Sequence, residues 1–140
     1  MTECKDQRWL FHDLGNRKVE VHFTEDPYKV VNCLCYEALS EWHLGEIATC
    51  QTTIAEAVTL ATELHAEALA LALSYAAALA LYEGNPAEVD RLASDLIELA
   101  TRHNFAYFLT VGSVYRGWAR ISVAWSLHPS AHSVEELGTS

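Results

Sequence analysis

The segment HAEALALALSYAAALALYEGNP, residues 65–86, is the most informative part of the sequence for the fold. Fifteen residues without a charge separate Glu67 from Glu83, and the only polar side chains among them are Ser74 and two tyrosines. The alternation of Ala and Leu in the first half is compatible with a β-strand, and the length and apolar character suggest a membrane span. Three structures therefore compete for this segment: a strand, a transmembrane helix and a helix buried in a protein core.

The composition of the segment favours a buried helix. Ala and Leu are strong helix formers, and no β-branched residue occurs between positions 66 and 83. A bilayer requires about 20 predominantly apolar residues, more than this segment provides. On a helix the large apolar residues form two stripes, Leu71, Tyr75, Leu79 and Tyr82 in the first and Leu69, Leu73, Ala76 and Ala80 in the second. A helix that is apolar on two sides predicts neighbours on both sides.

Turn-forming residues divide most of the remaining chain into helices. Gly84 suits the left-handed position after a helix, Asn85 can cap the next helix, and Pro86 fits its first turn. Glu88 follows the cap at the spacing of a capping box. The pair Asp26-Pro27 opens an earlier helix in the same way. The pattern predicts five helices, at about 27–44, 46–64, 66–83, 86–103 and 105–125, joined by very short turns.

The helices repeat. Gly45 and Gly84 lie 39 residues apart, and at the same offset AEAVTLATELH (55–65) aligns with SDLIELATRHN (94–104). A period near 40 with two helices per unit is typical of an α-solenoid of the tetratricopeptide or HEAT kind. We therefore expect an all-α, tetratricopeptide-like α-solenoid of antiparallel helix pairs over residues 26–128. Residues 1–25 form an extension, irregular or a short strand or helix, because KVEVHFT (18–24) alternates, and residues 129–140 form a polar tail.

Three segments carry a resemblance to a known group of proteins. DPYKVVNCLCYEALSEWHLGE (26–46), ATELHAEALALALSYAAALALYEGNPAEVDRLASDLIELATRHNF (61–105) and GSVYRGWA (112–119) resemble the tetratricopeptide-like region of large bacterial signalling proteins. Those proteins carry a predicted ATPase module and are often fused to class III adenylate or guanylate cyclase domains or to kinases. The resemblance covers about residues 22–119 and implies a repeat module of a sensor or scaffold. Neither a phosphate-binding loop nor the aspartates of a cyclase are present, so it implies no such activity here.

Charge and composition exclude several classes of partner. The net charge is −10 and the few basic residues are scattered, which argues against nucleic acid and against an anionic membrane surface. The first residues lack the apolar run of a signal peptide, so we expect a cytoplasmic protein with reduced cysteines. The predicted helices contain no pair of histidines at metal-binding spacing, and the sequence has no nucleophile motif. We expect no enzyme activity, no metal and no cofactor.

The first helix of each unit in such solenoids lines the concave side, where peptides bind. The polar and aromatic residues expected there are Asn32, Tyr36, Ser40, Ser74, Tyr75, Thr110, Ser113 and Arg116. A packing role fits the two tyrosines equally well. Arg116 is a lone cation in an apolar helix, and we expect it to pair with an internal carboxylate such as Glu37, or else with a carboxylate of the partner.

The third unit lacks its second helix, because position 123 holds Val instead of the turn glycine. The last helix is therefore left with apolar residues that a tail or a second copy must cover, and we expect a homodimer through Phe105, Phe108, Trp118 and Trp125. The sequence predicts a non-catalytic module that binds a protein or peptide and self-associates. The alternative is a small-ligand sensor domain that regulates an adenylate cyclase or ATPase partner.

Overall fold

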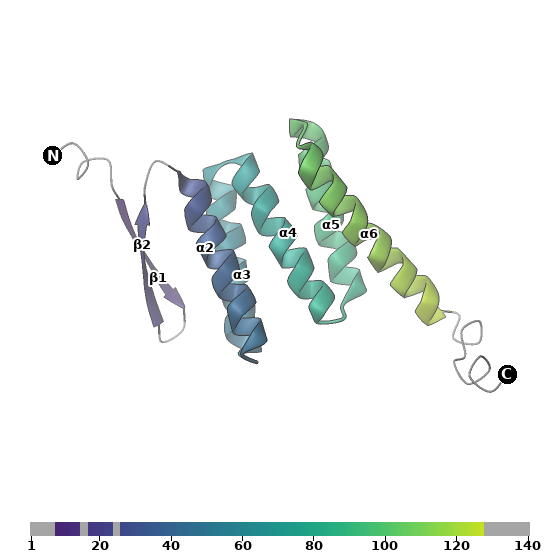
Figure 1. Ribbon diagram of the computed structural model, residues 1–140, viewed down its shortest axis with the longest axis horizontal. Coiled ribbons are helices and arrows are strands. Elements are labelled where there is room, and N and C mark those ends of the chain that lie inside the picture. The colour runs from purple at the N-terminus through teal and green to yellow at the C-terminus, as the bar shows by residue number, and fades with distance from the viewer. Residues whose placement is uncertain (1–7, 15–16, 24–25, 128–140) are drawn as a thin grey trace.

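The computed structural model of the chain describes residues 8–14, 17–23 and 26–127 (Figure 1). These ranges contain five helices, and the predicted number and positions of the helices are confirmed to within a few residues. In chain order the elements are β1 (Arg8–Leu14), β2 (Arg17–Phe23), α2 (Pro27–His43), α3 (Ile47–Leu64), α4 (Ala66–Tyr82), α5 (Pro86–His103) and α6 (Ala106–Leu127).

The two strands form an antiparallel hairpin within residues 1–25, for which the sequence allowed an irregular segment, a short strand or a short helix. Its register runs from the pair Arg8 and Phe23 to the pair Leu14 and Arg17. β2 contacts α2 and β1 contacts α3, so the hairpin lies beside the first helix pair. The polar tail that was predicted for residues 129–140 lies outside the described residues.

The helix pairs α2–α3 and α4–α5 match residue for residue. α2 and α4 each have 17 residues, α3 and α5 each have 18, and all four bounds of the second pair lie 39 residues after those of the first. Gly45 and Gly84 occupy the turns with φ of 82° and 69°, in the left-handed region that favours glycine. The amides of both glycines donate to the carbonyl three residues earlier, Trp42 O and Leu81 O, at 3.0 Å.

The match ends at the second junction of each unit. His65, between α3 and α4, is extended with φ −163°, whereas Asn104, between α5 and α6, is left-handed with φ 58°. His65 Nδ1 accepts a hydrogen bond from the amide of Ala68 at 3.2 Å and so caps the start of α4. Asn85 Oδ1 likewise accepts from the Glu88 amide at 3.3 Å. Of the predicted capping box, the hydrogen bond from the Glu88 amide to Asn85 is therefore formed, whereas the Glu88 carboxylate pairs with Arg91.

α4 is the central helix and packs against α2, α3, α5 and α6, which confirms the prediction of neighbours on two sides. α2, α4 and α6 form one layer, and α3 and α5 lie behind it in Figure 1. Alanines supply much of the core, which lets the helices approach closely. The fully buried ones are Ala38, Ala57, Ala61, Ala68, Ala70, Ala72, Ala77, Ala93 and Ala119.

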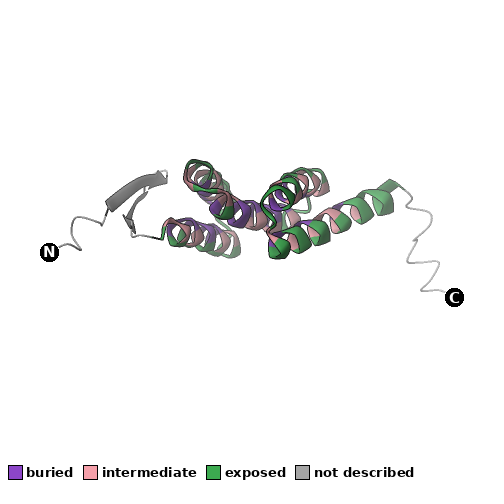
Figure 2. Cartoon of the chain, turned by 90° about the horizontal axis from the view of Figure 1, so that it is seen from above, coloured by how far each residue is buried: buried purple, intermediate pink, exposed green. Residues whose placement is uncertain are grey.

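Burial decreases along α6. Figure 2 shows the inner helices lined with buried residues, whereas the end of α6 is mostly exposed. Only Phe108, Gly112 and Ala119 of its 22 residues are buried. Among the helices of residues 26–127, none combines the length and the apolar character that a membrane crossing requires.

Candidate partner-binding groove

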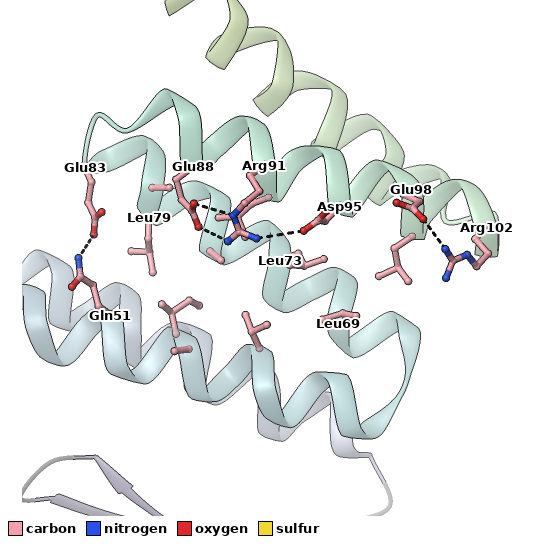
Figure 3. A pocket seen from close by; sticks show the side chains of 17 residues that line it. Gln51, Leu69, Leu73, Leu79, Glu83, Glu88, Arg91, Asp95, Glu98 and Arg102 are labelled. Atoms are coloured by element: carbon pink, nitrogen blue, oxygen red, sulfur yellow. Dashed lines mark hydrogen bonds and ion pairs between the residues drawn. The ribbon is translucent and has the colours of Figure 1, made fainter. Parts of the chain in front are cut away.

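A groove with a volume of about 740 Å³ runs between α3, α4 and α5 (Figure 3). α4 forms its floor, and α3 and α5 form its two walls. Most of the lining is aliphatic and comes from all three helices. The apolar lining residues are Ile54, Ala55 and Val58 of α3, Leu69, Leu73, Ala76, Leu79 and Ala80 of α4, and Leu92 and Leu99 of α5.

The groove exists because the side chains on its two walls do not meet above α4. The floor includes Ala76 and Ala80, whose short side chains leave depth between the walls. The α3 wall carries the small Ala55 and the polar Gln51, and the α5 wall carries long charged side chains that solvent can hydrate. The large apolar side chains of the walls, Ile54, Val58, Leu92 and Leu99, line the groove without filling it.

Ion pairs along α5 line one rim of the groove. Arg91 lies between Glu88 and Asp95: its Nε donates to Glu88 Oε2 at 3.0 Å, and its Nη1 lies 3.6 Å from Asp95 Oδ2. One turn further on, Arg102 Nη2 lies 2.8 Å from Glu98 Oε1. The hydrogen bond from Arg91 lowers the pKa of Glu88, against the opposing effect of partial burial. These spacings of three and four residues hold the charged side chains along the rim.

A polar contact ties α3 to the end of α4 at one end of the groove. Gln51 Nε2 donates to Glu83 Oε1 at 3.2 Å, as Figure 3 shows. With Glu83 included, the lining carries four carboxylates and two guanidinium groups. The groove therefore has an apolar interior and an excess of negative charge, which together favour a ligand with an apolar side and basic flanks.

The predicted partner-binding residues lie elsewhere. All eight are on α2, α4 and α6, and none of them lines this groove among the described residues. The structure brings Tyr36 and Tyr75 together, with ring centroids 5.7 Å apart in an edge-to-face arrangement. Burial, and then the hydrogen bond with Tyr36, raises the pKa of Tyr75 above its ordinary value. This pair joins α2 to α4, in agreement with the packing role that was left open for the tyrosines.

The predicted hydroxyl groups are used within their own helices. Ser40, Thr110 and Ser113 donate to the carbonyl four residues earlier, at 2.9, 3.1 and 2.8 Å. Ser74 donates to the carbonyl of Leu71 at 2.7 Å. These hydroxyls can still accept a hydrogen bond, but their protons are already engaged. Asn32 is half-buried on α2.

Arg116 is half-buried on α6, and it makes no ion pair with another residue of 26–127. The predicted pair with Glu37 is therefore not formed. The neighbouring Arg120 does have a partner, because its Nε lies 3.6 Å from Asp90 Oδ1 on α5.

The four residues predicted for self-association differ in their exposure. Phe108 is buried in the core of a single copy, and Phe105 and Trp118 are half-buried. Only Trp125 is exposed, at 58%. Phe108 is thus a core residue of the monomer and is not available at its surface, which corrects the prediction for that position.

The described residues show how the cysteines and the other possible metal ligands are placed. No group of three or more His, Cys, Asp and Glu side chains that could hold a metal occurs within the described residues. Cys33 is exposed and Cys35 is buried, as expected for positions two apart on a helix. Burial raises the pKa of the Cys35 thiol to about 12, so its thiolate is suppressed at neutral pH.

The sequence contained two indications of the groove. The stripe Leu69, Leu73, Ala76 and Ala80 was expected to pack against a neighbouring helix, and charged residues recur at helical spacing along α5, at Glu88, Asp95 and Glu98. The structure places both along the same groove. Comparisons with models of protein families, with curated proteins and with solved structures found no match for this chain.

Proposed function

We propose that this chain is a non-catalytic, tetratricopeptide-like interaction module that binds a helical segment of a protein partner in the groove between α3 and α5. The observation that carries the proposal is the groove itself, with its aliphatic floor on α4 and its charged rim on α5. Amphipathic helices bind proteins by laying an apolar face into an apolar groove of this kind.

The repeated helix pair supports the solenoid part of the proposal. Two pairs of 17 and 18 residues, a displacement of 39 residues and matching glycine turns are what a helical-repeat array requires. The setting that we propose, a bacterial signalling system with an ATPase or a class III cyclase, rests on the sequence resemblance in CLCYEALSEWHLG and YRGWA.

The charge of the rim determines the kind of segment that fits. Arg91 lies beside both Glu88 and Asp95, and Arg102 pairs with Glu98. With Glu83, the lining carries four carboxylates and two arginines, which leaves an excess of two negative charges. A partner helix with Leu-type residues on one face and Lys or Arg beside them buries its apolar face and meets this charge at the rim. An acidic helix of the same apolar content meets repulsion there.

A pair of peptides tests the proposal. The probes are fluorescein-labelled helices about five turns long, one built from Leu and Lys at amphipathic spacing and the other with Glu in place of Lys. Fluorescence anisotropy should show that the Lys peptide binds and the Glu peptide does not. Ala55→Trp fills the groove from the α3 wall and should weaken binding at least about tenfold, because it displaces the ligand from the apolar floor.

The matched control is Thr52→Trp, which adds the same side chain to an exposed position of α3 outside the groove. This variant should bind the Lys peptide as the wild type does. Equal binding of the Lys peptide by both variants would show that the peptide binds elsewhere, and no binding by the wild type would remove the proposal.

A small-ligand sensor is the second candidate, and the size of the groove favours it specifically. Pockets for small molecules typically measure about 300–1,000 Å³ and are lined mainly by apolar side chains. The groove has about 740 Å³ and fits that description. A thermal-shift screen of small apolar acids and amines distinguishes the two, because a stabilising compound whose effect Ala55→Trp abolishes supports the sensor.

A further inference from the structure

We infer that the outer face of α6 is a symmetric interface with a second copy of this chain. The face consists of Tyr107, Thr110, Val114, Gly117, Ile121 and Ala124, and it is called the α6 seam below. All six residues are exposed in the single copy. The seam is separate from the groove and includes none of the four residues that the sequence had suggested for self-association.

The seam has the spacing of a helix that pairs with another helix. Tyr107, Val114 and Ile121 follow one another at intervals of seven residues and are 73%, 65% and 68% exposed. Thr110, Gly117 and Ala124 fall three residues after each of them, which completes a heptad pattern of large and small residues. These side chains are largely exposed in the single copy, although the ring of Tyr107 also lies edge-to-face with that of Phe108, with centroids 5.2 Å apart.

The opposite side of α6 already packs within the monomer. Phe108, Gly112 and Ala119 are buried, and α6 contacts α4 and α5. Small residues on the seam allow a second helix to come close: a Cβ added at Gly117 meets no heavy atom within 4 Å. The hydroxyl of Thr110 donates to the Ala106 carbonyl, so its proton is already engaged when the seam is covered.

Charge indicates a second copy of this chain. The chain has a net charge of −10, so two copies repel each other over most of their surface. Each of α2 to α5 carries acidic residues, but α6 has none, and its charged residues are Arg116 and Arg120. Two copies can therefore approach through α6 without bringing carboxylates of that helix together. A contact of the same face on both copies also closes as a dimer and does not extend into a filament.

Residues 128–140, which follow α6, offer too little apolar surface to cover the seam. Residues 128–140 read HPSAHSVEELGTS, in which Val134 and Leu137 are the only large apolar residues and two glutamates lie between them. The seam extends over about 26 Å of helix at about 1.5 Å per residue. A segment of that composition does not supply a matching apolar stripe, whereas the seam of a second copy does.

The seam is small for a dimer interface, and this sets the strength of the contact. A large apolar side chain offers about 100 Å² of surface to burial, so three large and three small residues provide on the order of 500 Å² per copy. Standard interfaces bury about 800 Å² per partner. We therefore expect a weak dimer with a dissociation constant on the order of micromolar, which forms and dissociates with concentration.

Light scattering after size-exclusion chromatography, over a concentration series, tests the inference. The wild type should change from the mass of one chain to that of two in the micromolar range. The double variant Val114→Glu, Ile121→Glu should remain a monomer, because it places four carboxylates in the contact. The control Thr59→Glu, Thr62→Glu adds the same charge to exposed positions of α3 and should dimerise as the wild type does.

If circular dichroism shows that the double variant is misfolded, a cysteine variant provides the test instead. In a background of Cys4→Ser and Cys33→Ser, Gly117→Cys should form a disulfide-linked dimer on mild oxidation, whereas Thr59→Cys on α3 should not, because Gly117 lies near the middle of the seam. A wild type that stays monomeric into the high micromolar range would overturn the inference. A dimer unaffected by the seam variant, or equal cross-linking at both cysteines, would also overturn it. None of these outcomes depends on peptide binding in the groove.

Discussion

Gly112 of α6 lies so close to Ile97 of α5 that the two helices touch through the glycine. A Cβ added at Gly112 would lie 2.8 Å from Ile97 Cγ1 and 3.3 Å from the carbonyl oxygen of Ala93. The absence of a side chain at this position sets how closely α6 can approach α5. Because α5 also forms a wall of the groove and α6 carries the seam, this contact holds the two proposed interaction surfaces in a fixed relation.

Gly112→Ala should destabilise the protein by about 1–3 kcal/mol, because the new methyl group must displace Ile97 or the backbone of α5. Gly117→Ala is the matched control on the same helix, with nothing within 4 Å of the added atom. It should raise stability by up to about 1 kcal/mol, since Ala is the better helix former. Urea unfolding at low protein concentration measures both, and equal effects of the two substitutions would contradict the close contact.

Thiol labelling should distinguish the cysteines by burial. Cys33 is exposed, whereas Cys35 and Cys50 are buried, and burial raises the pKa of both buried thiols, that of Cys35 to about 12. Iodoacetamide at mildly alkaline pH should therefore modify Cys33 quickly and the other two only after unfolding. Peptide mapping by mass spectrometry reads the result, and labelling of Cys35 at the rate of Cys33 in the folded protein would contradict the packing of α2.

The ion pair of Glu88 and Arg91 should make a small, acid-sensitive contribution to stability. The pKa of Glu88 is lowered from 4.5, so its contribution is present above that value and is lost as the pH falls through the lowered pKa of the folded state. The Glu88 side chain is 39% exposed, so solvent screening limits the effect to no more than about 1 kcal/mol. Thermal unfolding of Glu88→Gln should show a deficit at neutral pH that shrinks as the pH falls below 4.5.

High salt provides the control for this pair, because it screens exposed charges. The deficit of Glu88→Gln at neutral pH should shrink as salt is added. A deficit that persists unchanged in acid and in high salt would show that the substitution acts through something other than the charge of Glu88.

The helices could be predicted because their limits are set locally. Asp26 and Asn85 accept hydrogen bonds from the first turns of α2 and α5, prolines follow both, and Gly45 and Gly84 take the left-handed conformation that ends the preceding helices. Each of these effects depends on residues within a few positions of the boundary. A single sequence therefore contains the information that fixes them.

The groove could not be predicted in the same way because it depends on three helices at once. The residues of α4 that form its floor have the composition of a core, and Glu88, Arg91 and Glu98 on α5 have the spacing of a solvated helix face. Whether α3 and α5 meet above Ala76 depends on side-chain lengths across the fold. Which residues of α6 are exposed likewise depends on which side of the helix meets α5. The sequence of α6 alone does not fix that side, so the prediction placed Phe108 at the surface although it is buried.

The most direct test of the proposed function is to locate the bound helix on the protein. Titration of the ¹⁵N-labelled chain with the Leu and Lys peptide should change the amide shifts of residues that line the groove, such as Ala55, Leu73 and Leu99, to a saturating end point. Changes confined to the opposite layer, around Tyr36 and Ser113, would contradict the proposal and place the partner on the face formed by α2, α4 and α6.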